Sequence, residues 1–130
     1  MSSQPDAGRN ILIVEDDELI RRAMQMVLEW EGYTVFCVNN GQEALDFLRA
    51  GRRPALIVLD ILMPVLDGQQ FREEQLRDSS LASIPVIVVS AASFAEAVHA
   101  DHFVRKPFEV QELLDAIRDH FAEANVRPAT

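Results

Sequence analysis

Several polar side chains stand directly after apolar runs that are far apart in the chain. These are the carboxylates of Glu15, Asp16, Asp17 and Asp60, the hydroxyl of Ser90 and the ammonium of Lys106. Asp60 is the most unusual of them, because apolar residues precede it and two more, Ile61 and Leu62, follow it. A charge among such neighbours is costly unless another group compensates it.

The types of these groups fit chemistry on a phosphoryl group. Two carboxylates that meet at ~4 Å repel by about 4 kcal/mol at an effective dielectric constant near 20, so a hard divalent cation would stabilise such a cluster. Mg²⁺ prefers one or two carboxylates together with waters and phosphate oxygens. A nearby lysine and hydroxyl would bind anionic oxygens, and a carboxylate can itself act as nucleophile and carry the phosphoryl group. The candidate nucleophile is Asp60, because it ends the third of five predicted strands.

Alternating strands and amphipathic helices must position these groups. Apolar runs predict strands at 11–14, 33–38, 55–59, 84–90 and 102–106. Helical spacing of apolar residues predicts helices that begin after Asp16 or Asp17, after Asn40 and at 68–77, a short one near 94–98, and a last one along Val110, Leu113, Leu114, Ile117 and Phe121. This order predicts an α/β domain in which helices cover both faces of a parallel sheet. Ligands bind beyond the carboxyl ends of such strands, which is where the polar side chains are expected to meet.

Two details of packing also follow from residue types. The helix at 68–77 has few apolar residues, chiefly Phe71 and Leu76, and is therefore expected to pack lightly. Met24 and Met26 are expected in the core, and Trp30 is expected to pack at the end of the first helix.

Composition limits the classes of function. The chain has 130 residues and a formal net charge of −9, which favours cation binding and argues against a nucleic-acid surface. Its one cysteine, Cys37, cannot form an internal disulfide, which is typical of a reducing compartment. No segment is apolar for the ~18 residues of a membrane span, so we expect a cytoplasmic protein without membrane insertion.

Four segments together resemble the response-regulator receiver domains of two-component and phosphorelay signalling. They are "ILIVEDDE", "LIVLDILMPVLDG", "IPVIVVSA" and "FVRKPF", in this order and spacing, and the likeness covers residues 10 to about 123. The resemblance implies a doubly wound five-stranded parallel sheet of flavodoxin-like order 2-1-3-4-5. It also implies a domain at 10–123, between a disordered tail at 1–9 and a C-terminal tail at 124–130.

The resemblance assigns roles to individual residues. Asp60 matches the phosphoacceptor. Glu15 and Asp16 match the acidic pair that holds Mg²⁺ together with Asp60 and the backbone carbonyl of Leu62, while Asp17 is left to cap the helix. Ser90 matches the hydroxyl residue that moves toward the phosphoryl group, and Lys106 matches the lysine that pairs with it. The Lys106–Pro107 bond resembles the cis peptide usual there, and Phe103 matches the aromatic switch position.

The sequence departs from the family between Ser90 and Lys106. Sixteen positions separate these residues, several fewer than is usual, which predicts a shortened fourth helix in the region that matches the family's output surface. Leu62 and Ala92 stand where residues that orient the attacking water are common, and neither can do so by a hydrogen bond. We therefore expect slow self-dephosphorylation.

The implied function is a stand-alone phosphoacceptor module, not a true enzyme. It would take a phosphoryl group from a sensor histidine kinase or a histidine phosphotransfer protein and switch binding to a downstream protein, without direct DNA contact. The alternative is an interaction scaffold of the same fold that is never phosphorylated. A phosphatase with an aspartate nucleophile would need a second acid two residues after Asp60, where Leu62 stands.

Overall fold

The computed structural model describes residues 9–61, 63, 65–90 and 100–126, and the side chains of these as far as residue 123. Within them the chain forms five strands and four helices, which alternate along most of the sequence. The elements are β1 (Asn10–Val14), α1 (Glu18–Trp30), β2 (Thr34–Val38), α2 (Gly41–Arg49), β3 (Leu56–Asp60), α3 (Gly68–Arg77), β4 (Val86–Ser90), β5 (His102–Arg105) and α4 (Val110–Val126).

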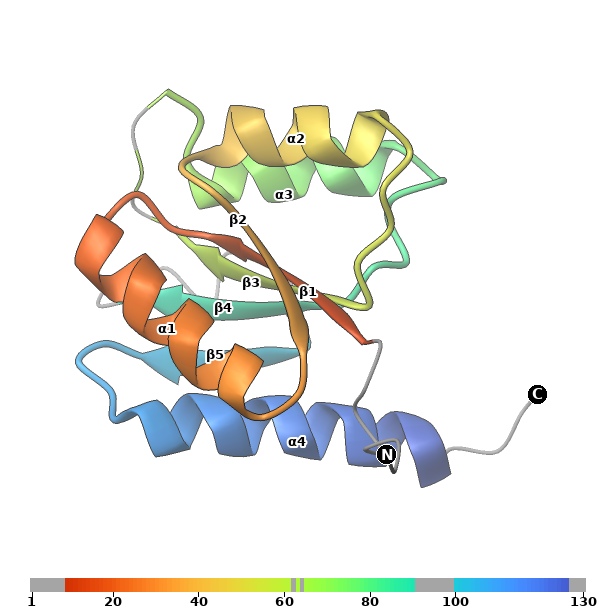
Figure 1. The fold of residues 1–130 in the computed structure, drawn as a ribbon. Coiled ribbons are helices and arrows are strands. Elements are labelled where there is room, and N and C mark those ends of the chain that lie inside the picture. The colour runs from red at the N-terminus through yellow and green to blue at the C-terminus, as the bar shows by residue number, and fades with distance from the viewer. Residues whose placement is uncertain (1–8, 62, 64, 91–99, 127–130) are drawn as a thin grey trace.

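The strands form one parallel sheet of order β2-β1-β3-β4-β5, which confirms the predicted order (Figure 1). β1 is paired with β2 and β3 on its two sides, and β3 is paired with β4, where Asp60 stands opposite Val89. β4 in turn pairs with β5, so that Ser90 stands opposite Arg105. The three central strands are buried on both faces, as the continuous apolar runs predict.

Helices cover both faces of the sheet, α2 and α3 on one and α1 and α4 on the other (Figure 1). Each face has its own apolar cluster. The first includes Met24 and Leu28 of α1 and Leu113, Leu114, Ile117 and Phe121 of α4. The second includes Ala44, Leu45 and Leu48 of α2 and Phe71 of α3. The stripe predicted for the last helix is therefore confirmed, except that Val110 is partly exposed.

Side-chain caps fix where the helices begin. Asp17, not Asp16, caps α1, because its carboxylate accepts hydrogen bonds from the backbone N–H groups of Leu19 and Ile20. Asp67 caps α3 in a capping box with Gln70, and α3 has the predicted bounds. The carboxyl end of β1 is thereby followed by a short turn that is capped where α1 begins.

Three packing predictions were wrong. α3 does not pack lightly, because Phe71 is fully buried and the polar side chains of Arg72 and Gln75 are buried beside it. Met26 and Trp30 are 69% and 87% exposed, because both lie off the apolar stripe of α1 that faces the sheet. An apolar residue type at a helix position does not by itself place that residue in the core.

Two further predictions concern residues outside the described ones. They are the short helix near 94–98 and the disordered tail at 1–9, of which only residue 9 is described. The Lys106–Pro107 bond is cis, as predicted. Among the described residues, no helix combines the length and the apolar character that a bilayer span requires.

Candidate functional site

The candidate residues lie at or just after the carboxyl ends of strands, and these strand ends share one edge of the sheet (Figure 1). Glu15 follows β1, Asp60 and Ser90 are the last residues of β3 and β4, and Lys106 follows β5. Because β1, β3, β4 and β5 are consecutive in the sheet, these four positions lie side by side at one rim. We call this edge the carboxylate rim.

Three carboxylates converge on the carboxylate rim. One oxygen from each of Glu15, Asp16 and Asp60 lies within 4.8 Å of the other two. Glu15 and Asp60 are buried, with 1% and 6% of their surface exposed, whereas Asp16 is exposed. Burial strengthens the repulsion between like charges because it removes the water that would screen them. The carboxylate rim therefore concentrates negative charge at a site that is partly shielded from solvent.

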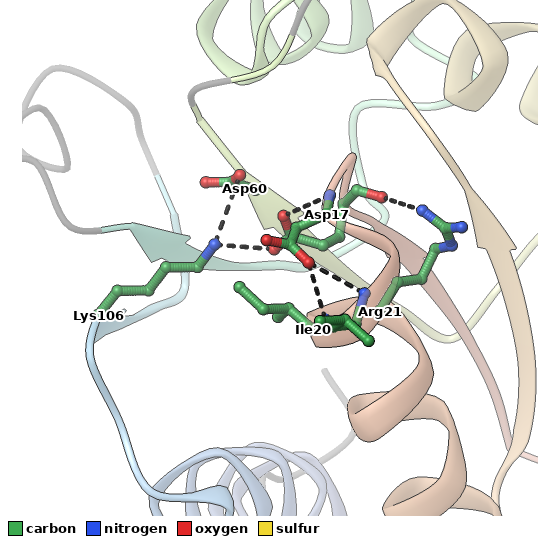
Figure 2. Close-up of polar contacts among 7 residues, drawn as sticks. Asp17, Ile20, Arg21, Asp60 and Lys106 are labelled. Atoms are coloured by element: carbon green, nitrogen blue, oxygen red, sulfur yellow. Dashed lines mark hydrogen bonds and ion pairs between the residues drawn. The ribbon is translucent and has the colours of Figure 1, made fainter.

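Lys106 provides the positive charge nearest to these carboxylates. Its Nζ atom lies 2.9 Å from Glu15 Oε1 and 3.5 Å from Asp60 Oδ2, and Figure 2 shows its side chain reaching toward Asp60. Burial by itself would lower the pKa of the Lys106 ammonium. Its hydrogen bond with Glu15 and the charges of Asp60 and Glu15 outweigh burial, so that the pKa of Lys106 is raised. The lysine is thus held in its charged form between two carboxylates.

One ammonium does not balance three carboxylates. The cluster keeps a formal excess of two negative charges, which a single divalent cation would cancel. The donors fit Mg²⁺, because all three are hard carboxylate oxygens and one of them is exposed. A bound Mg²⁺ would supply the positive charge that these three carboxylates lack. Glu15, Asp16 and Asp60 are therefore the residues that would hold the metal.

The backbone around Glu15 is held by contacts that the sequence did not predict. Arg21 of α1 donates from Nη1 to the carbonyl oxygen of Glu15 at 2.9 Å. The N–H of Asp17 donates to Glu15 Oε2 at 3.2 Å. Figure 2 shows Asp17 directed toward Ile20 and Arg21 in the first turn of α1, as its capping role requires. The Asp17 carboxylate thus caps α1, whereas the Glu15 carboxylate belongs to the carboxylate rim.

Gly68 is a second residue of the site that sequence reasoning missed. A Cβ atom at this position would lie 2.4 Å from the carbonyl oxygen of Asp60 and 2.6 Å from the Cα of Ile61. Its N–H donates to the carbonyl oxygen of Ile61 at 2.8 Å. Glycine therefore lets α3 begin against the end of β3. The Asp-Gly pair at 67–68 was the signal in the sequence for this glycine, but it predicted only that a helix begins there.

The turn after Asp60 is anchored and strained. The carbonyl oxygen of Leu66 accepts a hydrogen bond from the N–H of Gly41 at 2.9 Å, which ties the turn to α2. Val65 has φ +70°, a left-handed conformation that is unfavourable for a β-branched residue, and its side chain is 78% exposed. Strained backbone of this kind is concentrated at functional sites, since the rest of the fold must hold it in place.

The remaining candidates are placed as follows. Ser90 is fully buried at the end of β4, and its carbonyl oxygen accepts a hydrogen bond from the N–H of Lys106 at 2.9 Å. Phe103 lies on β5 opposite Val88, short of the rim, and is 37% exposed. Leu62, the predicted backbone ligand, lies outside the described residues. The structure therefore brings together Glu15, Asp16, Asp60, Ser90 and Lys106.

Comparison with known proteins identifies the family. The family model described as "Response regulator receiver domain" matches residues 11–118. The chain belongs to the response regulator receiver family. The resemblance seen in the four sequence segments is thereby confirmed, as is the α/β fold of order 2-1-3-4-5. Receiver domains of this family are components of two-component signalling systems.

This receiver domain resembles one half of longer regulators. It is 40% identical over 115 residues to the uncharacterized transcriptional regulatory protein YkoG of Bacillus subtilis, covering 84% of this chain and 49% of that protein. It is 39% identical over 114 residues to the response regulator MprA of Mycolicibacterium vanbaalenii, covering 83% of this chain and 48% of that protein. The chain thus spans about half the length of the curated relatives it matches.

Solved structures agree over nearly the whole chain. The signal receiver domain of a signal transduction histidine kinase from Syntrophus aciditrophicus superposes with a TM-score of 0.84 at 30% identity, covering 95% of this chain and 97% of that one. The receiver domain of the sensor histidine kinase PA1611 from Pseudomonas aeruginosa has a TM-score of 0.79 at 27% identity, covering 87% and 97%. The PA1611 structure holds a magnesium ion coordinated in its active-site cleft.

Proposed function

We propose that Asp60 accepts a phosphoryl group from a phosphohistidine, with Mg²⁺ held by Glu15, Asp16 and Asp60. The observation that carries this proposal is the cluster of three carboxylates within 4.8 Å that share one ammonium. The magnesium ion in the similar PA1611 receiver domain supports it. The resemblance adds the backbone carbonyl of Leu62 as a further ligand.

The residues of the carboxylate rim would act as follows. A carboxylate oxygen of Asp60 attacks phosphorus, the phosphorus–nitrogen bond of the donor breaks, and the leaving imidazole takes up a proton. Bound Mg²⁺ would supply positive charge to the phosphoryl oxygens. Lys106, already 3.5 Å from Asp60, would move its ammonium from the carboxylates to a phosphoryl oxygen. Ser90 would donate its hydroxyl proton to another phosphoryl oxygen, and Phe103 would follow this movement as the aromatic switch.

Intact mass spectrometry tests the proposal. After incubation with Mg²⁺ and a small phosphodonor such as acetyl phosphate, the wild-type chain should gain the mass of one phosphoryl group. Asp60→Asn should gain none, and neither should the wild type in excess chelator. Asp46→Asn, which removes a carboxylate from the exposed side of α2, is the matched control and should behave as wild type.

The same experiment distinguishes the phosphoacceptor from the second candidate function, an interaction scaffold. A phosphorylation-independent interaction scaffold of the same fold would show no mass gain under any of these conditions. The complete set of Glu15, Asp16, Asp60, Ser90 and Lys106 favours the phosphoacceptor. The short span between Ser90 and Lys106, which departs from the family, is the feature that favours the scaffold.

The partners belong to the proposal as well. We propose a sensor histidine kinase or a histidine phosphotransfer protein as donor, in the cytoplasm, and a downstream protein as target. The functional unit would be residues 10–123, although α4 continues past this boundary to Val126. That the chain makes no direct DNA contact stays a prediction from its charge of −9, since one of its relatives is described as a transcriptional regulatory protein.

The proposal includes the lifetime of the phosphorylated state. The module would catalyse only its own phosphorylation and a slow loss of the phosphoryl group, because Leu62 and Ala92 carry no side-chain group that could orient the attacking water. Leu62→Asn should shorten the lifetime of the phosphorylated species, measured by intact mass at timed intervals after donor removal. Leu62→Met, which adds no hydrogen-bonding group of comparable strength, should leave it unchanged. Equal lifetimes for wild type and Leu62→Asn would contradict this part of the proposal.

A further inference from the structure

A small pocket lies at the opposite end of the sheet from the carboxylate rim. It has a volume of about 260 Å³ and is lined by Asn10, Phe36, Phe47, Arg52, Arg53 and Pro54. Asn10 begins β1, whereas Glu15 follows its end, so the pocket and the rim are separated by the length of a five-residue strand. This is about 16 Å at ~3.3 Å per residue. Figure 1 shows the turn from α2 to β3 at the end of the sheet away from the carboxyl ends of the strands.

Aromatic rings and a guanidinium shape this pocket. The rings of Phe36 on β2 and Phe47 on α2 have centroids 5.4 Å apart and are tilted by 51°. The Cζ atom of Arg52 lies 5.3 Å from the Phe36 centroid and 5.2 Å from the Phe47 centroid. Arg52 is nevertheless exposed, so a guanidinium plane held near two rings also faces solvent. A planar aromatic group can stack on such a surface.

Arg53 places a second guanidinium at the same pocket. Its Nη1 atom donates to the carbonyl oxygens of Leu48, at 2.6 Å, and of Arg52, at 2.9 Å. These bonds fix the side chain at the C-terminal end of α2, while the residue as a whole remains exposed. The other N–H groups of a guanidinium can then bind an anion from a fixed position.

The charge of the pocket contrasts with that of the chain. None of the residues that line it is acidic, although the chain carries a net charge of −9. Within the described part of the chain, Arg52 makes no ion pair with a carboxylate, whereas the neighbouring Arg49 is paired with Glu74 at 3.6 Å. Two arginines beside two aromatic rings are therefore gathered in a small basic pocket on an acidic protein.

We propose that this pocket binds a small aromatic anion, a single planar ring that bears a carboxylate or phosphate group. The ring stacks on the exposed side of the Arg52 guanidinium, which the Phe36–Phe47 pair supports from the other side, and the anionic group binds the guanidinium of Arg53. The pocket volume of about 260 Å³ is smaller than the roughly 300–1,000 Å³ of pockets for drug-sized ligands. It therefore fits a ligand with one ring and its anionic group. Binding at this pocket does not require phosphorylation of Asp60, so the domain would have a ligand site separate from the carboxylate rim.

Backbone amide NMR with three probes tests the proposal, in buffer without Mg²⁺. Phenyl phosphate should shift the amide signals of Phe36, Phe47, Arg52 and Arg53. Its dissociation constant should be at least about tenfold lower than those of benzyl alcohol and inorganic phosphate, because each of these lacks one of the two contacts. Equal affinity for phenyl phosphate and inorganic phosphate would overturn the proposal, since the rings would then contribute nothing.

Matched variants separate a pocket from a general charge effect. Arg52→Gln should weaken phenyl phosphate binding by about tenfold, whereas Arg49→Gln, which removes the same charge outside the pocket, should change it less than about twofold. Equal weakening by both would show a general field effect and overturn the proposal. Arg52→Lys keeps the charge and loses the planar stack, so it should bind almost as weakly as Arg52→Gln. Full binding by Arg52→Lys would also overturn it.

A last comparison excludes the carboxylate rim as the binding place. Asp60→Asn should bind phenyl phosphate with the wild-type affinity and show the same set of shifted signals. If the shifted signals were those of Lys106 and its neighbours, or were lost in Asp60→Asn, the ligand would occupy the rim and the proposal would fail. Amide signals that keep the dispersion of the wild-type spectrum show in each variant that the sheet remains folded.

Discussion

Two groups of buried polar side chains in this receiver domain differ in how their charges and hydrogen bonds are balanced. One lies in α3, where Arg72 Nη1 donates to Gln75 Oε1 at 2.7 Å. The Gln75 amide nitrogen donates to the carbonyl oxygens of Leu81, at 2.9 Å, and of Ile84, at 3.0 Å. Burial lowers the pKa of Arg72, and the charge of Asp101 partly offsets this. The two hydrogen bonds from Gln75 join α3 to the turn before β4.

The carboxylate rim is the other group, and it is not balanced in this way. Glu15 and Asp60 are buried as deeply as Arg72, yet among the described residues one ammonium, that of Lys106, forms their ion pairs. The comparison shows how a structural group of buried polar side chains differs from a ligand-binding one. Buried polar groups that hydrogen-bond one another and the backbone stabilise the fold, whereas buried carboxylates that converge on one place favour the binding of a cation there.

Breaking the α3 group should have the largest effect on stability. Gln75→Ala removes the donor to the carbonyl oxygens of Leu81 and Ile84 and an acceptor for Arg72, so the free energy of unfolding should fall by about 3 kcal/mol. Denaturant unfolding followed by circular dichroism measures it. Gln42→Ala, which removes a contact on the exposed side of α2, is the control and should cost less than about 0.5 kcal/mol. Similar losses in the two variants would contradict a structural role for Gln75.

The corresponding change at the carboxylate rim should have the opposite sign. Asp60→Asn removes one of three like charges, and the relief of two repulsions exceeds the loss of the 3.5 Å contact with Lys106. In buffer without divalent cations the free energy of unfolding should rise by about 1 kcal/mol. Asp46→Asn, on the exposed side of α2, should change it by less than about 0.5 kcal/mol. A clear loss of stability in Asp60→Asn would show that the rim is balanced after all.

A smaller effect should appear at alkaline pH. Burial would lower the pKa of Lys106, but the hydrogen bond with Glu15 and the charges of Asp60 and Glu15 raise it above its unfolded value. The folded state therefore holds this proton more tightly. The resulting stabilisation is fully present below the ordinary lysine pKa of about 10.4 and is lost as the pH rises through the folded value. Thermal unfolding between pH 9 and 11 should accordingly show a steeper loss of stability for wild type than for Lys106→Met. Parallel pH profiles for the two proteins would contradict the raised pKa.

Most of the fold and of the rim could be predicted from the sequence. Continuous apolar runs gave the strands, and a parallel sheet necessarily brings the residues after them to one edge, so Glu15, Asp60, Ser90 and Lys106 could be grouped without a structure. The role of Asp17 as a cap followed from its place before an amphipathic helix.

Other features had no signal of this kind. Arg72 and Gln75 are buried by contacts with residues that lie close only after folding, and polar residue types predict exposure. Arg21 contacts a backbone carbonyl, which no side-chain pattern records. The need for glycine at position 68 depends on how closely α3 approaches the end of β3, a distance that the sequence does not contain.

The most direct test of the central claim is the affinity for Mg²⁺, measured by isothermal titration calorimetry on three proteins. If the rim carries an excess of negative charge that Mg²⁺ cancels, Asp16→Asn should bind the ion at least about tenfold more weakly than wild type. Lys106→Met should bind it more tightly, because the competing ammonium is gone. Equal affinities in all three proteins, or no binding to wild type at millimolar Mg²⁺, would contradict the account.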